Sequence, residues 1–351
     1  MYISIIGTTG AGKSTLFRAV AGGSATANGN GSSVATIDVP DERVDTLTKL
    51  FNPRKTVYAR ITVADTAAIH EGEARSETLD ATSLQQMRSS DALLLVLRLF
   101  DDGHPADPVS EFQTIQTELI LSDMVQVEQR LERIAKQGRV KAQPQLEQEK
   151  GLLERCLAHL EAGHPLSTLG LDADDDKRLR GFLFLSRKPM MIVVNYTEDR
   201  LNDAQAIVAG LKGRLPEQAP VLAACGQLEA ELASMAPSEQ AGFMAEYGID
   251  ESVRGRIICL ARDTLGLISF LTVGDDECRA WPVRNGITAQ EAAASIHTDL
   301  SRKFIRAETV SYDDFIRLDG FAGCKKAGLW RLEGKTYIVR DGDILSIRAG
   351  N

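Results

Sequence analysis

The sequence predicts an α/β protein with three parts: a parallel β-sheet flanked by helices, an antiparallel pair of helices inserted into it, and a small α+β module that follows. Three patterns carry this prediction. The first seven residues have the pattern of a buried strand and lead through a glycine-rich turn into a helical pattern. Helical patterns with narrow apolar seams fill 109–169, and an apolar strand resumes at 189–194. After residue 268 the strand patterns are short and separated by turns.

The composition is that of a globular protein of two or three domains. The 351 residues carry a net charge of -9, which argues against indiscriminate nucleic-acid binding but leaves a local basic face open. The longest apolar run, 92–97, is typical of a buried parallel strand and too short to cross a membrane. The cysteines form no C-x-x-C pair, which indicates a reducing compartment. We therefore expect a cytoplasmic protein with no membrane partner; the cysteines are Cys156, Cys225, Cys259, Cys278 and Cys324.

The turn after the first strand matches a phosphate-binding pattern. Gly7, Gly12, Lys13 and Ser14 satisfy G-x-x-x-x-G-K-[ST], with a strand before and a helix after, as the motif requires. Inward-pointing backbone N–H groups and the helix N-terminus favour an anion. We expect Lys13 to reach the β- and γ-phosphates and assist the chemistry there, and Ser14 to bind Mg²⁺. The residues expected to contact the nucleotide are Gly10, Ala11, Gly12, Lys13, Ser14 and Thr15.

A second strand ends in a carboxylate. In A-R-I-T-V-A-D-T-A-A-I the apolar alternation of Ile61 and Val63 precedes Asp65. A carboxylate at this strand tip would hold Mg²⁺ through a water. Ala68 stands where the D-x-x-G pattern has glycine, so the backbone N–H is kept but the peptide is less free to flip. A strand that merely ends in aspartate is the alternative.

A third strand, K-P-M-M-I-V-V-N-Y-T-E-D, ends at Asn195. Proteins that read guanine carry N-K-x-D here, and the aspartate accepts two hydrogen bonds that adenine cannot donate. This chain has Tyr196 in place of the lysine and Glu198 in place of the aspartate. We therefore expect Asn195 and Glu198 to frame the base, and ATP to bind better than GTP. The alternative is a strand end followed by an acidic helix start.

Taken together, these segments resemble the YchF, or Obg-like, ATPases over nearly the whole chain. The resemblance rests on the phosphate loop, D-T-A-A-I, N-Y-T-E, C-G-Q-L-E-A-E-L and, most specifically, R-A-W-P-V-R-N-G-I-T-A-Q-E-A-A-A-S-I-H-T-D-L-S-R-K-F and L-E-G-K-T-Y-I-V-R-D-G-D-I-L-S-I-R. It implies a P-loop NTPase G domain over 1–108 and 170–268, an inserted helical hairpin over 109–169 and a TGS domain over 269–351. It also implies slow ATP hydrolysis with Mg²⁺, association with ribosomes and stress responses, and a second base loop at Cys225 and Gly226.

The inserted region supports this layout on its own residues. Apolar residues recur at helical spacing from Phe112 to Ile134, Gly138 and Pro144 bracket a turn, and a second apolar stripe follows. Basic residues gather towards the turn, where they would touch RNA phosphates or form an ordinary solvated face. They are Arg130, Arg133, Lys136, Arg139 and Lys141.

The C-terminal stretch is expected to bind a partner and not to catalyse a reaction. Its expected strands are 268–273, 278–282, 335–339 and 344–348, with a helix near 289–299. His297 is expected on that helix in a structural role, and we see no nucleophile–base pair. A partner-binding surface is favoured over a purely structural role, and ribosome or RNA is the partner that the resemblance implies.

Several positions depart from the family pattern. Gly10 replaces the asparagine linked to potassium activation, so potassium dependence is not expected. The stretch 22–44 is rich in Gly, Asn and Ser, which predicts a mobile loop, and Thr36 is the stand-in for the family's Mg²⁺-binding threonine. Ile69 fits the hydrophobic residue that replaces a water-orienting glutamine. The resemblance places His104 where a loop histidine assists hydrolysis.

These observations favour a slow ATP-dependent switch with a translation-related partner. A nucleotide-binding regulator with negligible hydrolysis is the second hypothesis, because the two segments that correspond to the family's switch regions, 22–44 and 70–88, both depart from its pattern; the second lacks the family's G-x-G-x-G run. A GTP-preferring GTPase is disfavoured by N-Y-T-E, and a small-molecule kinase by the absence of acceptor-site chemistry in the C-terminal stretch.

Overall fold

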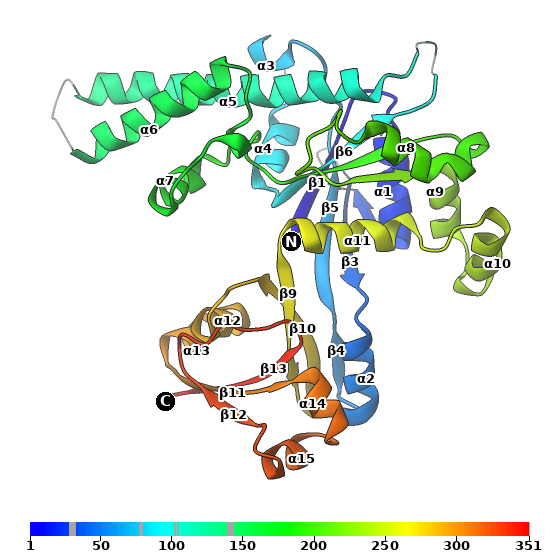
Figure 1. Ribbon diagram of the computed structural model, residues 1–351, viewed down its shortest axis with the longest axis vertical. Helices are drawn as coiled ribbons and strands as arrows, with labels where there is room; N and C mark the ends of the chain where they lie inside the picture. Colours follow the sequence, from blue (N-terminus) through cyan, green and yellow to red (C-terminus); the bar gives the residue numbers. More distant parts are fainter. Residues whose placement is uncertain (28–32, 77–79, 102, 104, 139–143, 351) are drawn as a thin grey trace. The chain divides into compact units, whose positions relative to one another are not determined.

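The computed structural model describes residues 1–27, 33–76, 80–101, 103, 105–138 and 144–350 (Figure 1). Its contacts divide the chain into two compact units. The first comprises Met1–Thr36 and Thr62–Leu260, and the second comprises Ile37–Ile61 and Ala261–Asn351.

A seven-stranded sheet in the order β2-β3-β5-β1-β6-β7-β8 forms the centre of the first unit. The strands β5, β1, β6, β7 and β8 run parallel, whereas β2 is antiparallel to β3. The inner strands β1 and β6 are almost wholly buried because they are apolar on both faces, as expected of a covered parallel sheet. The strands are β1 (Tyr2–Ile6), β2 (Ala25–Ala27), β3 (Ser33–Val39), β5 (Ala59–Asp65), β6 (Ala92–Arg98), β7 (Met190–Asn195) and β8 (Val221–Ala224).

Helices cover this sheet, and the predicted α/β class is confirmed. The phosphate-binding pattern lies between β1 and the first helix, and the core contains buried Ile6, Leu95 and Val194. The α-helices are α1 (Lys13–Ala21), α3 (Glu73–Ser76), α4 (Ala81–Ser89), α7 (Ala173–Leu179), α8 (Ala204–Leu211), α9 (Gly226–Ser234), α10 (Pro237–Tyr247) and α11 (Val253–Thr264). Short 3-10 helices are η1 (Gly22–Ser24), η2 (Leu166–Thr168), η3 (Arg180–Phe182) and η4 (Glu198–Asp203).

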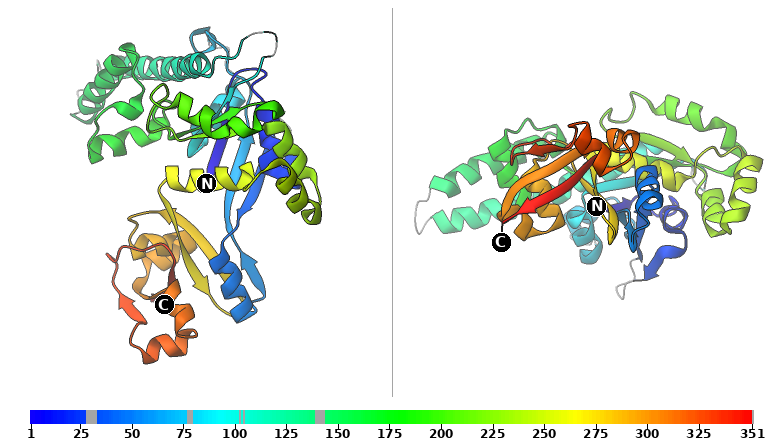
Figure 2. Two further views of the ribbon diagram at one scale, coloured as in Figure 1. Left: turned by 45° about the vertical axis from the view of Figure 1, so that its right-hand side comes forward. Right: turned by 90° about the horizontal axis from the view of Figure 1, so that it is seen from below.

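The predicted helical hairpin is present as α5 (Pro108–Gly138) and α6 (Pro144–Glu161), which lie side by side in both Figures 1 and 2. Its apolar seam buries Val127, Ile134 and Leu153. At its base, buried Asp123 accepts hydrogen bonds from the backbone N–H groups of Leu185 and Ser186 at 2.9 and 2.8 Å. The hairpin is thereby fixed to the segment that leads into β7.

The second unit is built on a six-stranded sheet in the order β12-β11-β13-β9-β10-β4. Its strands are β4 (Lys55–Val57), β9 (Leu267–Val273), β10 (Glu277–Arg284), β11 (Phe304–Ser311), β12 (Arg331–Glu333) and β13 (Asp343–Ala349). Its helices are α2 (Glu42–Phe51), α12 (Ala289–Ile296), α13 (Thr298–Arg302), α14 (Tyr312–Arg317) and α15 (Phe321–Lys326).

The division of the chain differs from the expected one because residues 37–61 join the C-terminal stretch. Phe51 on α2 stacks on Phe315 with ring centroids 5.9 Å apart and meets Phe321 edge-on at 5.8 Å. The strand β4 also pairs with β10. An apolar helix face and a strand edge that lie far from residue 269 in the sequence thus complete this unit.

Three further expectations were wrong. Residues 335–339 form no strand and make only an isolated bridge between Ile338 and Thr288. His297 is not within a helix: it separates α12 from α13, and its exposed ring accepts a hydrogen bond from the N–H of Asp299. The stretch 22–44, expected as a loop, contains η1, β2, β3 and the start of α2, with residues 28–32 outside the described part.

Candidate functional site

The phosphate loop joins β1 to α1 and needs its glycines. Gly7, Gly10 and Gly12 have positive φ angles of 152°, 76° and 92°. A Cβ atom at Gly7 would lie 2.6 Å from the carbonyl oxygen of Val96, and one at Gly12 would lie 2.1 Å from Asn195 Nδ2. Because such contacts are too close, side chains are excluded at both positions. Gly12 precedes α1 directly, so the loop presents the N-terminus of that helix.

Lys13 folds back over this loop. Its ammonium group donates a hydrogen bond to the carbonyl oxygen of Thr8 at 2.8 Å, and the residue is only 8% exposed. Burial lowers the pKa of Lys13, and the negative charge of Asp65 opposes that shift. The loop therefore encloses a cation at the place where a phosphate chain would need one.

Asp65, at the end of β5, lies beside Ser14. Burial raises the pKa of Asp65, and the nearby Ser14 hydroxyl and the positive charge of Lys13 oppose that shift. One oxygen of this carboxylate, Oδ1, is buried and has no hydrogen-bond partner among the described residues. A hydroxyl beside an unsatisfied carboxylate oxygen is a set of hard donors that suits Mg²⁺. Among the described residues no group of three or more His, Cys, Asp and Glu side chains is arranged to hold a metal ion by itself, so phosphate and water would have to complete the coordination here.

Thr36 does not join this pair. Its hydroxyl lies 3.1 Å from that of Thr62, and Thr62 pairs with Tyr2 at the start of β1. The phosphate loop follows the opposite end of β1. The expectation that Thr36 stands in for the metal-binding threonine is therefore corrected: β3 is a regular strand here, and Thr36 in its middle contacts Thr62 of β5 instead of the Ser14–Asp65 pair.

The segment after Asp65 reaches the phosphate loop at two consecutive residues, Ile69 and His70, and of these the sequence had singled out only Ile69. The backbone N–H of Ile69 donates to the carbonyl oxygen of Gly7 at 3.1 Å, while its side chain is buried in the core. The ring of the next residue, His70, lies with Nε2 3.2 Å from the hydroxyl oxygen of Thr9. His104, the histidine expected from the resemblance, lies outside the described residues.

Asn195 joins the two loops expected at the base. Its Oδ1 accepts a hydrogen bond from the N–H of Gly226 at 2.9 Å, and its Nδ2 donates to the carbonyl oxygen of Ala11 at 3.0 Å. The neighbouring Cys225 is buried, and burial raises the pKa of its thiol. Both polar atoms of the Asn195 side chain are thus used in hydrogen bonds that hold the phosphate loop and the second base loop.

A cavity of about 480 Å³ opens beside these residues. It brings together Asn195, Glu198 and the phosphate loop, which the sequence had proposed separately. Phe100, which sequence reasoning missed, also lines it; its signal is an aromatic residue just beyond the end of β6. The lining residues are Gly10, Gly12, Thr15, Phe100, Asn195, Tyr196, Thr197, Glu198, Asp199, Cys225 and Gln227.

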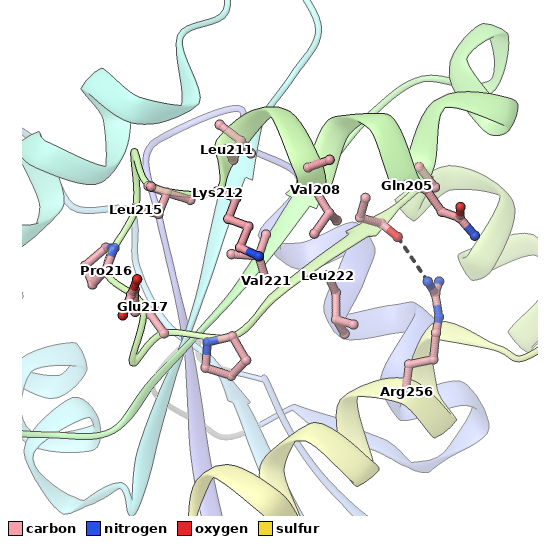
Figure 3. A pocket seen from close by; sticks show the side chains of 16 residues that line it. Gln205, Val208, Leu211, Lys212, Leu215, Pro216, Glu217, Val221, Leu222 and Arg256 are labelled. Atoms are coloured by element: carbon pink, nitrogen blue, oxygen red, sulfur yellow. Dashed lines mark hydrogen bonds between the residues drawn. The ribbon is translucent and has the colours of Figure 1, made fainter.

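A second cavity, of about 650 Å³, lies between α8 and the edge strand β8 (Figure 3). Its lining is mainly apolar, with side chains such as Val208, Leu211 and Val221. Arg256 from α11 closes one end by donating a hydrogen bond to the carbonyl oxygen of Ala223 at 3.1 Å. None of the phosphate-loop residues line it. The cavity beside Asn195 is therefore the candidate nucleotide site.

Within the described part of the chain, no helix is both long and apolar enough for a membrane span.

Two family models match the chain. Residues 2–137 match a family described as a 50S ribosome-binding GTPase, and residues 267–350 match one described as a protein of unknown function (DUF933). The first range contains the phosphate loop, Asp65 and most of the hairpin's first helix. The second range contains most of the second unit's sheet, from β9 to β13.

Named relatives and solved structures match almost end to end. The ribosome-binding ATPase YchF of Bacillus subtilis (strain 168) is 36% identical, with 98% of each chain covered, and that of Escherichia coli O157:H7 is 33% identical, with 97% of each covered. The structure of the Schizosaccharomyces pombe YchF GTPase has a TM-score of 0.82 at 26% identity, over 99% of this chain and 97% of that one. A GTP-binding protein of Pyrococcus horikoshii OT3 shares the fold at 20% identity, with a TM-score of 0.61 and both chains fully covered. Because relatives above 30% identity span nearly its whole length, the chain belongs to the YchF family.

Proposed function

We propose that this protein binds ATP with Mg²⁺ at the phosphate loop, hydrolyses it slowly and acts as a nucleotide-dependent switch in the cytoplasm. The observation that carries the proposal is the Ser14–Asp65 pair, whose unsatisfied carboxylate oxygen lies next to a loop that already encloses the Lys13 ammonium group. The relatives named as ribosome-binding ATPases support the same activity.

Each residue has a defined part in this mechanism. The backbone N–H groups of the loop and the N-terminus of α1 bind the phosphates, and Lys13 leaves the carbonyl of Thr8 to neutralise the β- and γ-phosphates. Ser14 and Asp65, the latter through a water, would hold Mg²⁺, which when bound offsets phosphate charge. Asn195 fixes the base loop against the phosphate loop, and Glu198 lies at the rim of the cavity.

A regulator with negligible hydrolysis is the second candidate. The observation that favours it is the altered segment after Asp65, where Ala68 replaces the glycine of D-x-x-G and the next residue, Ile69, is apolar and buried. We separate the two candidates by single-turnover ATP hydrolysis with Mg²⁺ in the parent and in Lys13→Ala. The proposed ATPase requires a parent rate clearly above that of Lys13→Ala, whereas equal rates at saturating ATP would leave the regulator.

The base preference has its own test. Guanine recognition needs a carboxylate that accepts two hydrogen bonds, and Glu198 is longer than the aspartate that does so and begins a 3-10 helix. A lost bidentate base contact costs about 1–3 kcal/mol by analogy with other base readout. We expect ATP to bind more tightly than GTP in one titration series. Tighter GTP binding would overturn the assignment to ATP.

The ribosome is the proposed partner, because the relatives are named for binding it. The hairpin is the surface that we propose for this contact, and the C-terminal unit is the second. Sedimentation of the protein with ribosomes, in ATP and without nucleotide, tests the partner: a bound fraction that changes with nucleotide supports a switch.

A further inference from the structure

The ring of His70 contacts the phosphate loop at the end where the γ-phosphate would lie. Its partner Thr9 follows Thr8, whose carbonyl oxygen receives the ammonium group of Lys13. The lysine of this motif reaches the β- and γ-phosphates, so its ammonium group marks the γ-phosphate end of the loop. The imidazole of His70 therefore lies at that end and on the side from which the segment after Asp65 approaches.

The backbone on both sides of His70 is held in place. Ile69 is bonded to the carbonyl of Gly7, and the N–H of His70 donates to Glu73 Oε2 at 2.9 Å. Farther along, the N–H groups of Gly72 and Ala74 donate to the buried carboxylate of Glu118 at 2.7 and 2.8 Å. The imidazole itself is exposed, so it is free to exchange Thr9 for another partner while its backbone stays fixed.

The neighbouring side chains of this segment are unsuited to holding a water at a phosphate. Thr66 donates its hydroxyl to the carbonyl of Ile5 at 2.6 Å, Ala68 has only a methyl group, and Ile69 is buried. Glu71 is exposed, but its negative charge opposes that of the phosphates. An imidazole can accept a proton from water and bears no negative charge.

We propose that His70 is a catalytic residue of the ATP hydrolysis proposed above, on which this inference rests. With ATP bound, Nε2 exchanges the hydroxyl of Thr9 for the attacking water. The water oxygen forms a bond to the γ-phosphorus, and the bond from that phosphorus to the β,γ-bridging oxygen breaks, its electron pair leaving on ADP. The proton of the water passes to Nε2 and from there to solvent, so the imidazole is regenerated.

The test compares single-turnover hydrolysis and ATP affinity in full-length variants with Mg²⁺. His70→Ala should lower the rate by about tenfold or more, since a positioned general base contributes roughly 10²–10⁴-fold in faster enzymes, while ATP affinity stays within about two-fold. His70→Gln should fall between parent and His70→Ala, because an amide orients the water but takes no proton. His164→Ala, which removes another exposed histidine of the same unit, should match the parent.

The outcomes separate this inference from the proposed function. If the parent hydrolyses ATP no faster than Lys13→Ala, both the proposed ATPase function and the role of His70 are overturned, because there is then no hydrolysis for His70 to assist. A parent faster than Lys13→Ala with His70→Ala at the parent rate overturns the role of His70 alone. A His70→Ala protein that loses ATP affinity as much as rate also overturns it, since His70 would then shape the loop instead of acting on the water.

Discussion

Asn195 Oδ1 accepts a hydrogen bond from the backbone N–H of Gly226 at 2.9 Å, across the ends of the neighbouring strands β7 and β8. Through Nδ2 the same side chain holds the carbonyl oxygen of Ala11 in the phosphate loop. There is no room for a side chain at Gly12, and a Cβ atom at Gly226 would lie only 3.0 Å from Asn195 Oδ1. One buried amide thus sets the spacing between the phosphate loop and the base loop.

Asn195→Ala should therefore weaken both the fold and ATP binding. Each buried backbone group left unpaired costs about 1–3 kcal/mol, so we expect a clear drop in the urea midpoint and at least about tenfold weaker ATP binding. Asn195→Asp keeps the acceptor for Gly226 but turns a carboxylate oxygen towards the carbonyl oxygen of Ala11, so it should weaken ATP binding at least as much as Asn195→Ala does. An Asn195→Ala protein with the parent's midpoint and affinity would contradict this role for the amide.

Glu118 couples the hairpin to the segment that carries His70. Its carboxylate, 2% exposed, accepts from both Gly72 and Ala74. Glu118→Gln leaves one acceptor oxygen and should cost about 1–3 kcal/mol through the N–H group that loses its partner, with Glu118→Ala costing more. The backbone amides of Gly72 and Ala74 should exchange hydrogen faster in both variants. Unchanged protection of these two amides in Glu118→Ala would show that the carboxylate does not hold the segment.

The sequence predicted those parts of the fold and site that depend on local signals. The apolar β1 and β6, the phosphate loop and the seam of the hairpin each follow from residues close together in the chain. The contacts that were missed join distant residues: Thr9 with His70, 61 residues apart, and Gly72 with Glu118, 46 residues apart. Such pairings depend on topology, which a periodic pattern does not reveal.

The mistaken strand at 335–339 has a similar cause. Tyr337 and Val339 have the alternation of a strand, but their backbone groups bond to Ala289 and Ile287 around the start of α12. In the same unit β4 occupies the edge of the sheet beside β10. A strand from residues 55–57 thus completes a sheet that the sequence assigned entirely to the C-terminal stretch. Local propensity for extended backbone was present at both places, and tertiary pairing decided which became a strand.

Asp123 should make stability depend on pH. Burial raises the pKa of this carboxyl from 3.8 to about 6, against the opposing effect of hydrogen bonds from Ser186 and Leu185. The folded state therefore binds this proton more tightly than the unfolded chain does, and the free energy of unfolding falls as pH rises from about 4 to 6. Two pKa units correspond to about 3 kcal/mol, all of it lost by pH 7.

Urea unfolding of the parent and Asp123→Asn between pH 4 and pH 7 isolates this effect, because other carboxyl groups titrate in both proteins. The amide introduced by Asp123→Asn would present an N–H group to one of the two backbone donors, so the variant should be less stable throughout. The parent's advantage should be larger at pH 4.5 than at pH 7. Parallel stability curves for the two proteins would show that Asp123 ionises alike in the folded and unfolded states.

The basic face near the hairpin turn includes two exposed side chains, those of Arg133 and Lys136. Arg130 forms an ion pair with Glu149 across the two helices, with 2.6 Å between Nε and Oε1, so it supports the hairpin. Arg133 is exposed, and Lys136 lies 3.8 Å from Glu132 in a pair that water surrounds. Exposed pairs of this kind contribute only about 0.3–0.5 kcal/mol, so Lys136 is readily available to phosphate. Arg139 and Lys141 lie outside the described residues.

If the hairpin meets ribosomal RNA, Arg133→Glu combined with Lys136→Glu should weaken sedimentation with ribosomes and flatten its salt dependence. Log K falls as log salt rises, and each lost phosphate contact makes this slope less steep by about 1. The slope of the double variant should therefore be less steep than the parent's by about 2. ATP affinity should stay at the parent's value, because both substitutions lie on α5 and none of the residues lining the nucleotide cavity belong to that helix. Lys212→Glu with Arg214→Glu, two exposed residues between α8 and β8, is the matched control. If the hairpin variant bound with the control's affinity and salt slope, the ribosome contact would fall to the C-terminal unit.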